Sequence, residues 1–210
     1  MTGNALVTLS LGIFLGVGTL GSSVAQDIGY GGRVEVPDSG VALTLPDDWV
    51  YLFPTPEMLD YMFGYVEEME DDPLVHDQGE LVQDEVGLTL LTYGPARAGS
   101  EIPETCTLAT LAPADFPGPE ALGLWVAMEL TAFATDEPAQ RPSVDYVDLP
   151  VGRVARLDFD TDDWAGQAST SCYLVPGDDS QHWLSCVGAE RPADRWLSIA
   201  ETFEFLPAEE

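Results

Sequence analysis

The sequence predicts a mixed α/β fold (α+β), in which helices pack against an antiparallel sheet. Short runs of alternating apolar and polar residues, separated by Gly, Pro and Asp turns, fill residues 143–205. Two upstream segments, residues 55–70 and 120–135, carry apolar side chains at helical spacing instead. Residues 143–205 are therefore expected to form the organising sheet, onto which the upstream segments fold.

The N-terminus has the pattern of a secretory signal peptide over residues 1–25. It carries no charged side chain, residues 5–20 are apolar, and Ser23-Val24-Ala25 is a small-x-small cleavage signal. The alternative is an uncleaved anchor, because about 20 apolar residues span a bilayer. We expect cleavage, and a mature chain that is secreted or lies in the periplasm or cell envelope.

The charge is strongly negative. The chain has 37 acidic residues against 7 basic ones, all Arg, and a formal net charge of −30. Such a surface repels nucleic-acid phosphates and anionic lipid headgroups, so no nucleic-acid partner and no membrane insertion of the mature chain are expected. It attracts cations or a basic partner, although the charge alone is also explained by solubility or by a salty habitat.

Upstream of the organising stretch, the glycine-rich residues 26–32 are expected to form a flexible lead-in. A single domain is predicted over residues 33–206, followed by an acidic tail at residues 207–210. The run VALTL at residues 41–45 is predicted to be a strand that stops at Pro46, and WVYLF at residues 49–53 to be its hairpin partner.

The helix predicted over residues 55–70 begins with Thr55 as its cap and Pro56 at its first position. Its apolar stripe is wider than one core face needs. One interpretation is a helix buried between the sheet and a neighbouring loop. The other is an adaptable surface for an unknown protein partner, with the candidate residues Met58, Tyr61, Met62, Tyr65 and Met69.

The three cysteines, Cys106, Cys172 and Cys186, are an odd number in a disulfide-permissive compartment. A three-residue loop in which Gly177 faces Gln181 would place Cys172 opposite Cys186, within disulfide reach. We therefore predict a Cys172–Cys186 disulfide and one free thiol. The rival pairings join Cys106 to either of the other two.

The order of elements and three segments resemble a known family. These segments are LPDDW at residues 45–49, VDLPVGRVARLDF at residues 147–159 and WLSIAETFEFL at residues 196–206. Together they resemble exported bacterial members of the PsbP/Mog-like superfamily, which includes the photosystem II extrinsic protein PsbP. The resemblance implies an α/β/α sandwich around a curved antiparallel sheet, and a role in binding larger assemblies without catalysis. It transfers no functional residue to this chain.

Known catalytic motifs are missing from the sequence: there is no G-x-S-x-G, Walker loop, H-E-x-x-H or C-x-x-C. His182 and Cys186 share a strand face but lie about 13 Å apart, too far for a nucleophile and its base. We therefore predict no enzyme, no catalytic residue and no required cofactor. A hydrolase with an unrecognised site is the more distant alternative.

The nearest match to a metal site is the acidic segment that holds Asp158, Asp160, Asp162 and Asp163. It fits the first ligand positions of a calcium loop but lacks the required Gly at position six and Glu at position twelve. We interpret it as an acidic turn between two strands, with calcium binding as the alternative. The leading expectation is a non-catalytic binding or accessory domain that acts through protein–protein contacts.

Overall fold

The structure is a computed structural model of the 210-residue chain. The residues that it describes are 28–37, 39–56, 58, 86–95, 103–111, 118–121, 123–124, 142–163, 166–177, 180–189, 191–192 and 194–207. The predicted signal peptide, most of the two predicted helices and most of the acidic tail lie outside these residues. No described helix has the length and apolar character needed to cross a membrane.

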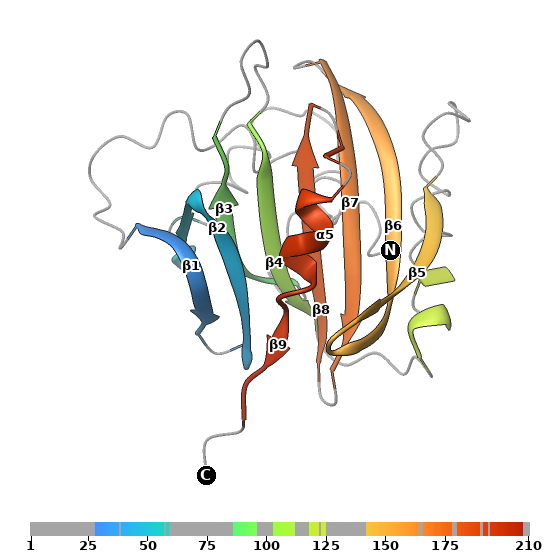
Figure 1. Ribbon diagram of the computed structural model, residues 1–210, viewed down its shortest axis with the longest axis horizontal. Helices are drawn as coiled ribbons and strands as arrows, with labels where there is room; N and C mark the ends of the chain where they lie inside the picture. Colours follow the sequence, from blue (N-terminus) through green and yellow to red (C-terminus); the bar gives the residue numbers. More distant parts are fainter. Residues whose placement is uncertain are drawn as a thin grey trace.

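Nine strands form one antiparallel sheet (Figure 1). Along the sheet they follow the order β1-β2-β3-β4-β8-β7-β6-β5, and β9 pairs with β2. The strands are β1 (Gly29–Val36), β2 (Val41–Leu52), β3 (Val86–Tyr93), β4 (Thr105–Leu111), β5 (Ser143–Leu149), β6 (Gly152–Asp163), β7 (Gly166–Pro176), β8 (Gln181–Gly188) and β9 (Glu204–Phe205). The helix α5 (Arg195–Ala200) lies between β8 and β9 in the chain.

The strand order divides the sheet into two meanders of four sequential strands each. The N-terminal meander comprises β1 to β4 and the C-terminal meander β5 to β8, and they meet where β4 pairs with β8. We call this β4–β8 boundary the seam. The Cys106–Cys186 disulfide lies across the seam between two directly opposed residues, with Cα atoms 4.1 Å apart.

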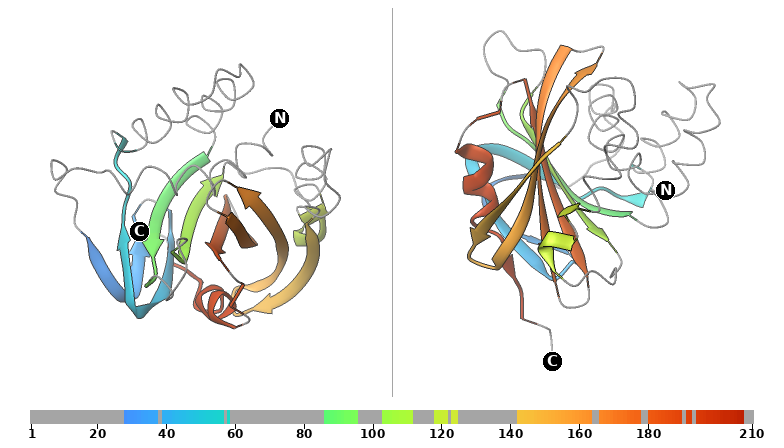
Figure 2. Two further views of the ribbon diagram at one scale, coloured as in Figure 1. Left: turned by 90° about the horizontal axis from the view of Figure 1, so that it is seen from above. Right: turned by 90° about the vertical axis from the view of Figure 1, so that its right-hand side faces the viewer.

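The sheet curls around α5, which lies in its concave side (Figure 2). One buried cluster joins side chains from strands near both ends of the sheet, such as Leu43 of β2 and Val154 of β6, with Trp196 and Ile199 of α5. Strands so far apart in a flat sheet would not share a core. The curvature therefore lets a six-residue helix seal the concave face.

The opposite face is buried as well. Its fully or nearly fully buried side chains include Leu91, Ala109, Leu157, Leu174 and Trp183. The helical residues around Gly123 contribute to this cover, because a Cβ built on Gly123 would lie 2.6 Å from the Ala155 Cβ of β6. Only glycine allows so close an approach.

The expected α/β/α sandwich is wrong. The described part of the chain is mainly an antiparallel β-sheet, and α5 on its concave face is a short helix of six residues. The strand patterns expected over residues 143–205 were correct for β5 to β8, but they carry no information on the curvature of the sheet. This sheet curls so that residues of β2 and β6 share one buried cluster with the short helix α5, and alternation along single strands does not predict such curvature.

The expected hairpin between residues 41–45 and 49–53 is also wrong. Both runs, apart from Phe53, belong to β2, and both pair with β1. Between them the register jumps from Gly32–Leu45 to Tyr30–Val50, so Pro46 and its neighbours form a bulge instead of a turn. Gly31 makes room for the bulge, because a Cβ there would lie 2.1 Å from the Pro46 carbonyl oxygen.

The strand β1 begins at Gly29, inside the segment expected to be a flexible lead-in. Its pairing with β2 already includes Gly29, opposite Tyr51. The glycine content suggested flexibility, but here the glycines allow close packing: the Tyr51 ring occupies the space where a Gly29 Cβ would lie.

The C-terminal segment returns across the seam to the N-terminal meander. Trp196, Ile199 and Ala200 of α5 are buried, and the short strand β9 follows. Beyond the short β9–β2 pairing, the Thr202 hydroxyl accepts a hydrogen bond from Thr44 N at 2.7 Å. The last elements thus cover part of the β2 edge that β3 leaves unpaired.

Candidate functional site

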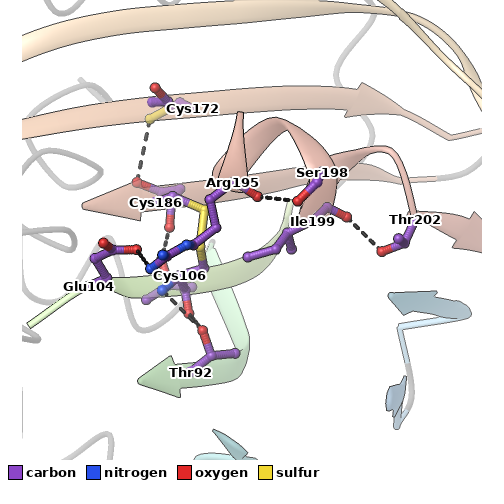
Figure 3. Close-up of a disulfide and its surroundings, with 12 residues drawn as sticks. Thr92, Glu104, Cys106, Cys172, Cys186, Arg195, Ser198, Ile199 and Thr202 are labelled. Atoms are coloured by element: carbon purple, nitrogen blue, oxygen red, sulfur yellow. Dashed lines mark hydrogen bonds and ion pairs between the residues drawn. A yellow bond between two sulfur atoms is a disulfide. The ribbon is translucent and has the colours of Figure 1, made fainter. Parts of the chain in front are cut away.

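The predicted Cys172–Cys186 disulfide is wrong, and the rival Cys106–Cys186 pairing is present (Figure 3). The β7–β8 hairpin pairs Pro176 with Gln181, so its loop is one residue longer than expected. Cys172 then faces Ser185, and Cys186 faces Ser171. A slip of one residue moves a side chain to the other face of the sheet, which puts the two thiols on opposite faces.

The free thiol of Cys172 is fully buried. Its Sγ lies 3.5 Å from the Ser185 hydroxyl, and burial raises the pKa of the thiol to about 12. Because the thiolate is the reactive form, this cysteine is a poor nucleophile at neutral pH.

The seam carries a buried carboxylate beside the disulfide (Figure 3). Glu104, directly before β4, has a side chain that is only 4% exposed and pairs with Arg195 of α5, with Nη1 and Oε2 2.9 Å apart. On the other side of the disulfide, the Thr92 hydroxyl accepts from Cys106 N and donates to Cys106 O. These contacts tie α5 and β3 to the seam and leave Glu104 committed to a structural ion pair.

The segment predicted as an acidic turn is part of strand β6. The β6–β7 pairing continues to Asp162–Gln167 and Asp163–Gly166. Alternate residues of a strand lie about 6.6 Å apart along one face, whereas a calcium loop wraps its ligands around one point. The side chains of Asp162 and Asp163 lie outside what the structure describes.

Asp158 and Asp160 belong to a β6–β7 charged cluster. Its members are Arg156, Asp158, Asp160, Ser169, Ser171 and Arg191.

Arg156 and Arg191 both pair with Asp158, and Arg156 also lies over the Tyr173 ring. Arg191 Nη2 further donates to the Phe159 and Thr170 carbonyls at 3.1 and 3.2 Å, bridging β6 and β7.

This cluster is an unfavourable cation site. Two guanidinium groups balance the two carboxylates, and Ser169 and Ser171 donate to the same carboxylates. Within the described part of the chain, no group of three or more His, Cys, Asp or Glu side chains gathers as metal ligands would. Asp158 and Asp160 therefore serve to bridge β6 and β7 through their contacts with the arginines and serines.

His182 is the one histidine among the described residues, and it lies beside two hydroxyl groups. Its Nε2 is 3.0 Å from the Ser180 hydroxyl and its Nδ1 is 3.2 Å from the Thr110 hydroxyl. The ring packs against both Phe203 and Phe205, which also contact each other, and burial lowers the pKa of His182 to about 4. A general base works best with a pKa near the working pH, so His182 is a weak base for the Ser180 hydroxyl. We interpret it as a buried histidine whose two ring nitrogens both have hydrogen-bond partners.

The predicted partner surface is not supported at the one residue described. Met58 is buried, which fits the alternative of a helix packed into the core. Its N–H bonds the Thr55 hydroxyl at 3.3 Å, as expected for Thr55 as a helix cap. Tyr61, Met62, Tyr65 and Met69 lie outside the described residues.

Among the described residues, the most exposed large apolar side chains lie instead at the start of β1 and directly before it. Tyr30 is 72% exposed and Ile28, directly before the strand, is 58% exposed. In the described sheet β1 has β2 as its neighbour on one side and no strand on the other, and it forms an outer edge in Figure 1. The sequence contained this signal, two large apolar residues among glycines, but its glycine content was interpreted as flexibility.

The surroundings of β1 are acidic. Glu35 on the strand and Asp47 and Asp48 in the β2 bulge are exposed. Arg33 is the one basic residue of β1, and it pairs with both Glu35 and Glu204. The β1 edge therefore combines exposed apolar side chains with a negative surround.

Comparisons with known proteins give no family. No family model matches the chain, and no curated protein matches it. Two similar solved structures are a Bacteroides thetaiotaomicron protein (TM-score 0.47, 10% identity) and LpqN, involved in cell envelope biogenesis of Mycobacterium tuberculosis (TM-score 0.46, 14% identity). The matches cover 85% of this chain and 50% of the Bacteroides chain, and 86% of this chain and 92% of LpqN. This chain thus spans half the length of the Bacteroides protein.

Proposed function

We propose that this chain is an extracytoplasmic, non-catalytic binding or accessory domain that acts through protein–protein contacts. The observation that carries the proposal is the β1 edge, where Tyr30 on the outermost strand of the described sheet and Ile28 directly before it are exposed. Exposed apolar side chains beside an unpaired strand edge are costly for a protein that works alone, because they favour aggregation. Their presence is explained by a partner that covers them.

Two features support a location outside the cytoplasm. The Cys106–Cys186 disulfide is typical of proteins that fold in oxidising compartments. The apolar N-terminal segment has the pattern of an export signal. The proposed location is therefore the cell envelope, the periplasm or the secreted fraction.

The absence of catalysis is part of the proposal and rests on the chemistry of the described groups. Cys172 is held as a buried thiol, His182 is a weak base, and the charges of Asp158 and Asp160 are compensated by arginines. The resemblance to the PsbP/Mog-like superfamily agrees with this proposal, because known members bind larger assemblies.

The composition of the chain supplies a selective test. The chain has no lysine and 37 carboxylates, so a carbodiimide can couple its Asp and Glu side chains to lysines of a partner. Copies of this chain can couple to each other only through an N-terminal amine. The full chain with a C-terminal affinity tag would be produced in its native host and treated with carbodiimide in intact cells.

We expect a discrete heavier species that contains a second protein and forms at physiological and at high salt. A lysine-to-lysine cross-linker is the matched control, and should give little or no adduct. Failure of the carbodiimide to produce any adduct at either salt concentration would contradict the proposed function.

A further inference from the structure

We infer that the β1 edge binds an extended, basic segment of a partner protein, which adds to the sheet as a further strand. This inference rests on the proposed function and specifies where the partner binds and what chemistry it presents. It follows from the backbone geometry of β1, from the apolar side chains on it and from the charges around it.

The backbone of β1 offers unpaired hydrogen-bonding groups. In an antiparallel ladder, alternate residues direct their N–H and C=O groups toward one neighbouring strand, and the residues between direct them to the other side. β1 pairs with β2 along Gly29–Val36 and with no other described strand. Half of its amide groups therefore face outward and can pair with an added strand.

The two outer edges of the sheet are protected differently. On β5 the exposed residues are Ser143, Asp145 and Asp148, which discourage strand addition by charge and polarity. On β1 the first half carries no charge, and Tyr30 is exposed.

The start of β1 also offers aromatic surface on both faces. The Tyr51 ring lies against Gly29, while Tyr30 is paired with Val50 and projects from the other face. Successive side chains of an added strand point to opposite faces. An apolar residue on either face of that strand therefore finds an aromatic neighbour.

The charges around the edge select a basic segment. The one basic residue of β1, Arg33, is paired with Glu35 and Glu204, and the exposed Asp47 and Asp48 of the β2 bulge add two further carboxylates beside β1. The whole chain carries a net charge of −30, which opposes pairing with a second copy and binding to anionic membranes. A segment that alternates Lys or Arg with an apolar residue fits both the charge and the aromatic contacts.

Amide hydrogen exchange measured by NMR on the full chain tests the inference. The probe is a synthetic peptide of alternating Lys and Val. We expect it to slow exchange of the outward-facing amides within residues 29–36 by about tenfold or more, because those amides gain hydrogen-bond partners. An alternating Glu and Val peptide, and a Lys–Val peptide with a central Pro, should have little effect.

Paired variants locate the contact. The double substitution Ile28→Ser and Tyr30→Ser should weaken binding of the Lys–Val peptide by about tenfold or more, since both apolar anchors are lost. Leu124→Ser is the matched control, because Leu124 is 55% exposed and lies away from β1 in the chain. This control should bind like the original chain.

Several outcomes overturn the inference. They are no slowing at residues 29–36, equal slowing by the Pro-containing peptide, slowing at β5 instead, protection of β1 that grows with protein concentration alone, or protection by anionic vesicles. If the carbodiimide adduct forms equally with the Ile28→Ser and Tyr30→Ser variant, binding to a protein stands and the β1 site is wrong. If no adduct forms with the original chain, the proposed function itself fails.

Discussion

The two meanders meet at one seam but differ in regularity and in the edges they expose. In the C-terminal meander, β6 and β7 pair in unbroken register from Ala155–Leu174 to Asp163–Gly166. In the N-terminal meander, β1–β2 and β3–β4 both contain register shifts, and β2 pairs with β3 only at residues 50–52. The regular half ends in an edge with exposed acids, and the irregular half ends in the apolar β1 edge.

This difference indicates that the C-terminal meander is the scaffold and that the N-terminal meander carries the candidate site. Long, regular pairs and the β6–β7 charged cluster fix the C-terminal meander. Bulges are common at sheet edges, where they re-aim side chains or end strand pairing. The β2 bulge brings Asp47 against Gly31 of β1. The irregular meander therefore assembles the acidic and apolar features of the candidate site, while the disulfide holds it to the scaffold.

The largest expected effect on stability comes from removing the disulfide across the seam. The double substitution Cys106→Ser and Cys186→Ser should lower the free energy of unfolding by about 2–5 kcal/mol, because the disulfide closes a loop with a sequence separation of 80. Urea denaturation measures the change. Cys172→Ala is the control, and should cost about 1 kcal/mol.

Thiol counting checks the same pairing. Alkylation of the unfolded, non-reduced chain should label one cysteine, and peptide mapping should identify it as Cys172. Labelling of Cys106 would contradict the seam disulfide.

The second effect is acid sensitivity of the hairpin that joins β7 to β8. Burial lowers the pKa of His182 to about 4 from an ordinary value of 6.5. The unfolded chain therefore binds the proton more readily, and protonation of His182 favours unfolding. The stability that the neutral His182 allows is fully present above pH 6.5 and is lost as the pH falls toward 4. The loss amounts to roughly 3 kcal/mol.

The comparison with His182→Gln isolates this contribution from the carboxylates, whose protonation relieves repulsion in both proteins. Stability of the original chain should fall more steeply between pH 7 and pH 4.5 than that of the variant. Parallel curves would contradict the assigned pKa of His182.

A third, smaller effect distinguishes the charged cluster from surface ion pairs. Arg191→Met should destabilise the chain by about 1–3 kcal/mol, because it leaves Asp158, with a side chain 12% exposed, short of a partner and removes bonds to two carbonyls. Arg153→Met, at an exposed pair with Glu120, should cost about 0.5 kcal/mol. Thermal unfolding compares the two, and equal losses would contradict the bridging role of Arg191.

The smallest effect on stability is expected at the β1 edge. The double substitution Ile28→Ser and Tyr30→Ser should change the free energy of unfolding by about 0.5 kcal/mol or less, since both side chains are already exposed. A loss of several kcal/mol would mean that these side chains support the fold instead of a partner.

Local patterns in the sequence predicted most strands, but not how the sheet closes. Alternation identified β6 and the β7–β8 hairpin, because each depends on neighbouring residues. The prediction of the disulfide failed because the loop between Pro176 and Gln181 is one residue longer than expected, and alternation does not determine loop length. The curvature that replaces the sandwich depends on contacts between strands distant in the chain.

The candidate site was missed for a related reason. Glycines in β1 serve close packing against Tyr51 and Pro46, and that role is invisible without the partner strand. The pattern around Asp158 suggested calcium, because a sequence shows carboxylates but not the arginines that fold against them. Arg191 lies 33 residues from Asp158 in the chain but pairs with it in the structure.

The most direct test of the account is to map the coupled carboxylates in the carbodiimide adduct by mass spectrometry. Both sheet edges carry exposed acids, so the chemistry treats them alike. The account predicts coupling to partner lysines at Glu35, Asp47, Asp48 or Glu204, around β1. Coupling confined to Asp145 and Asp148 on β5 would contradict it.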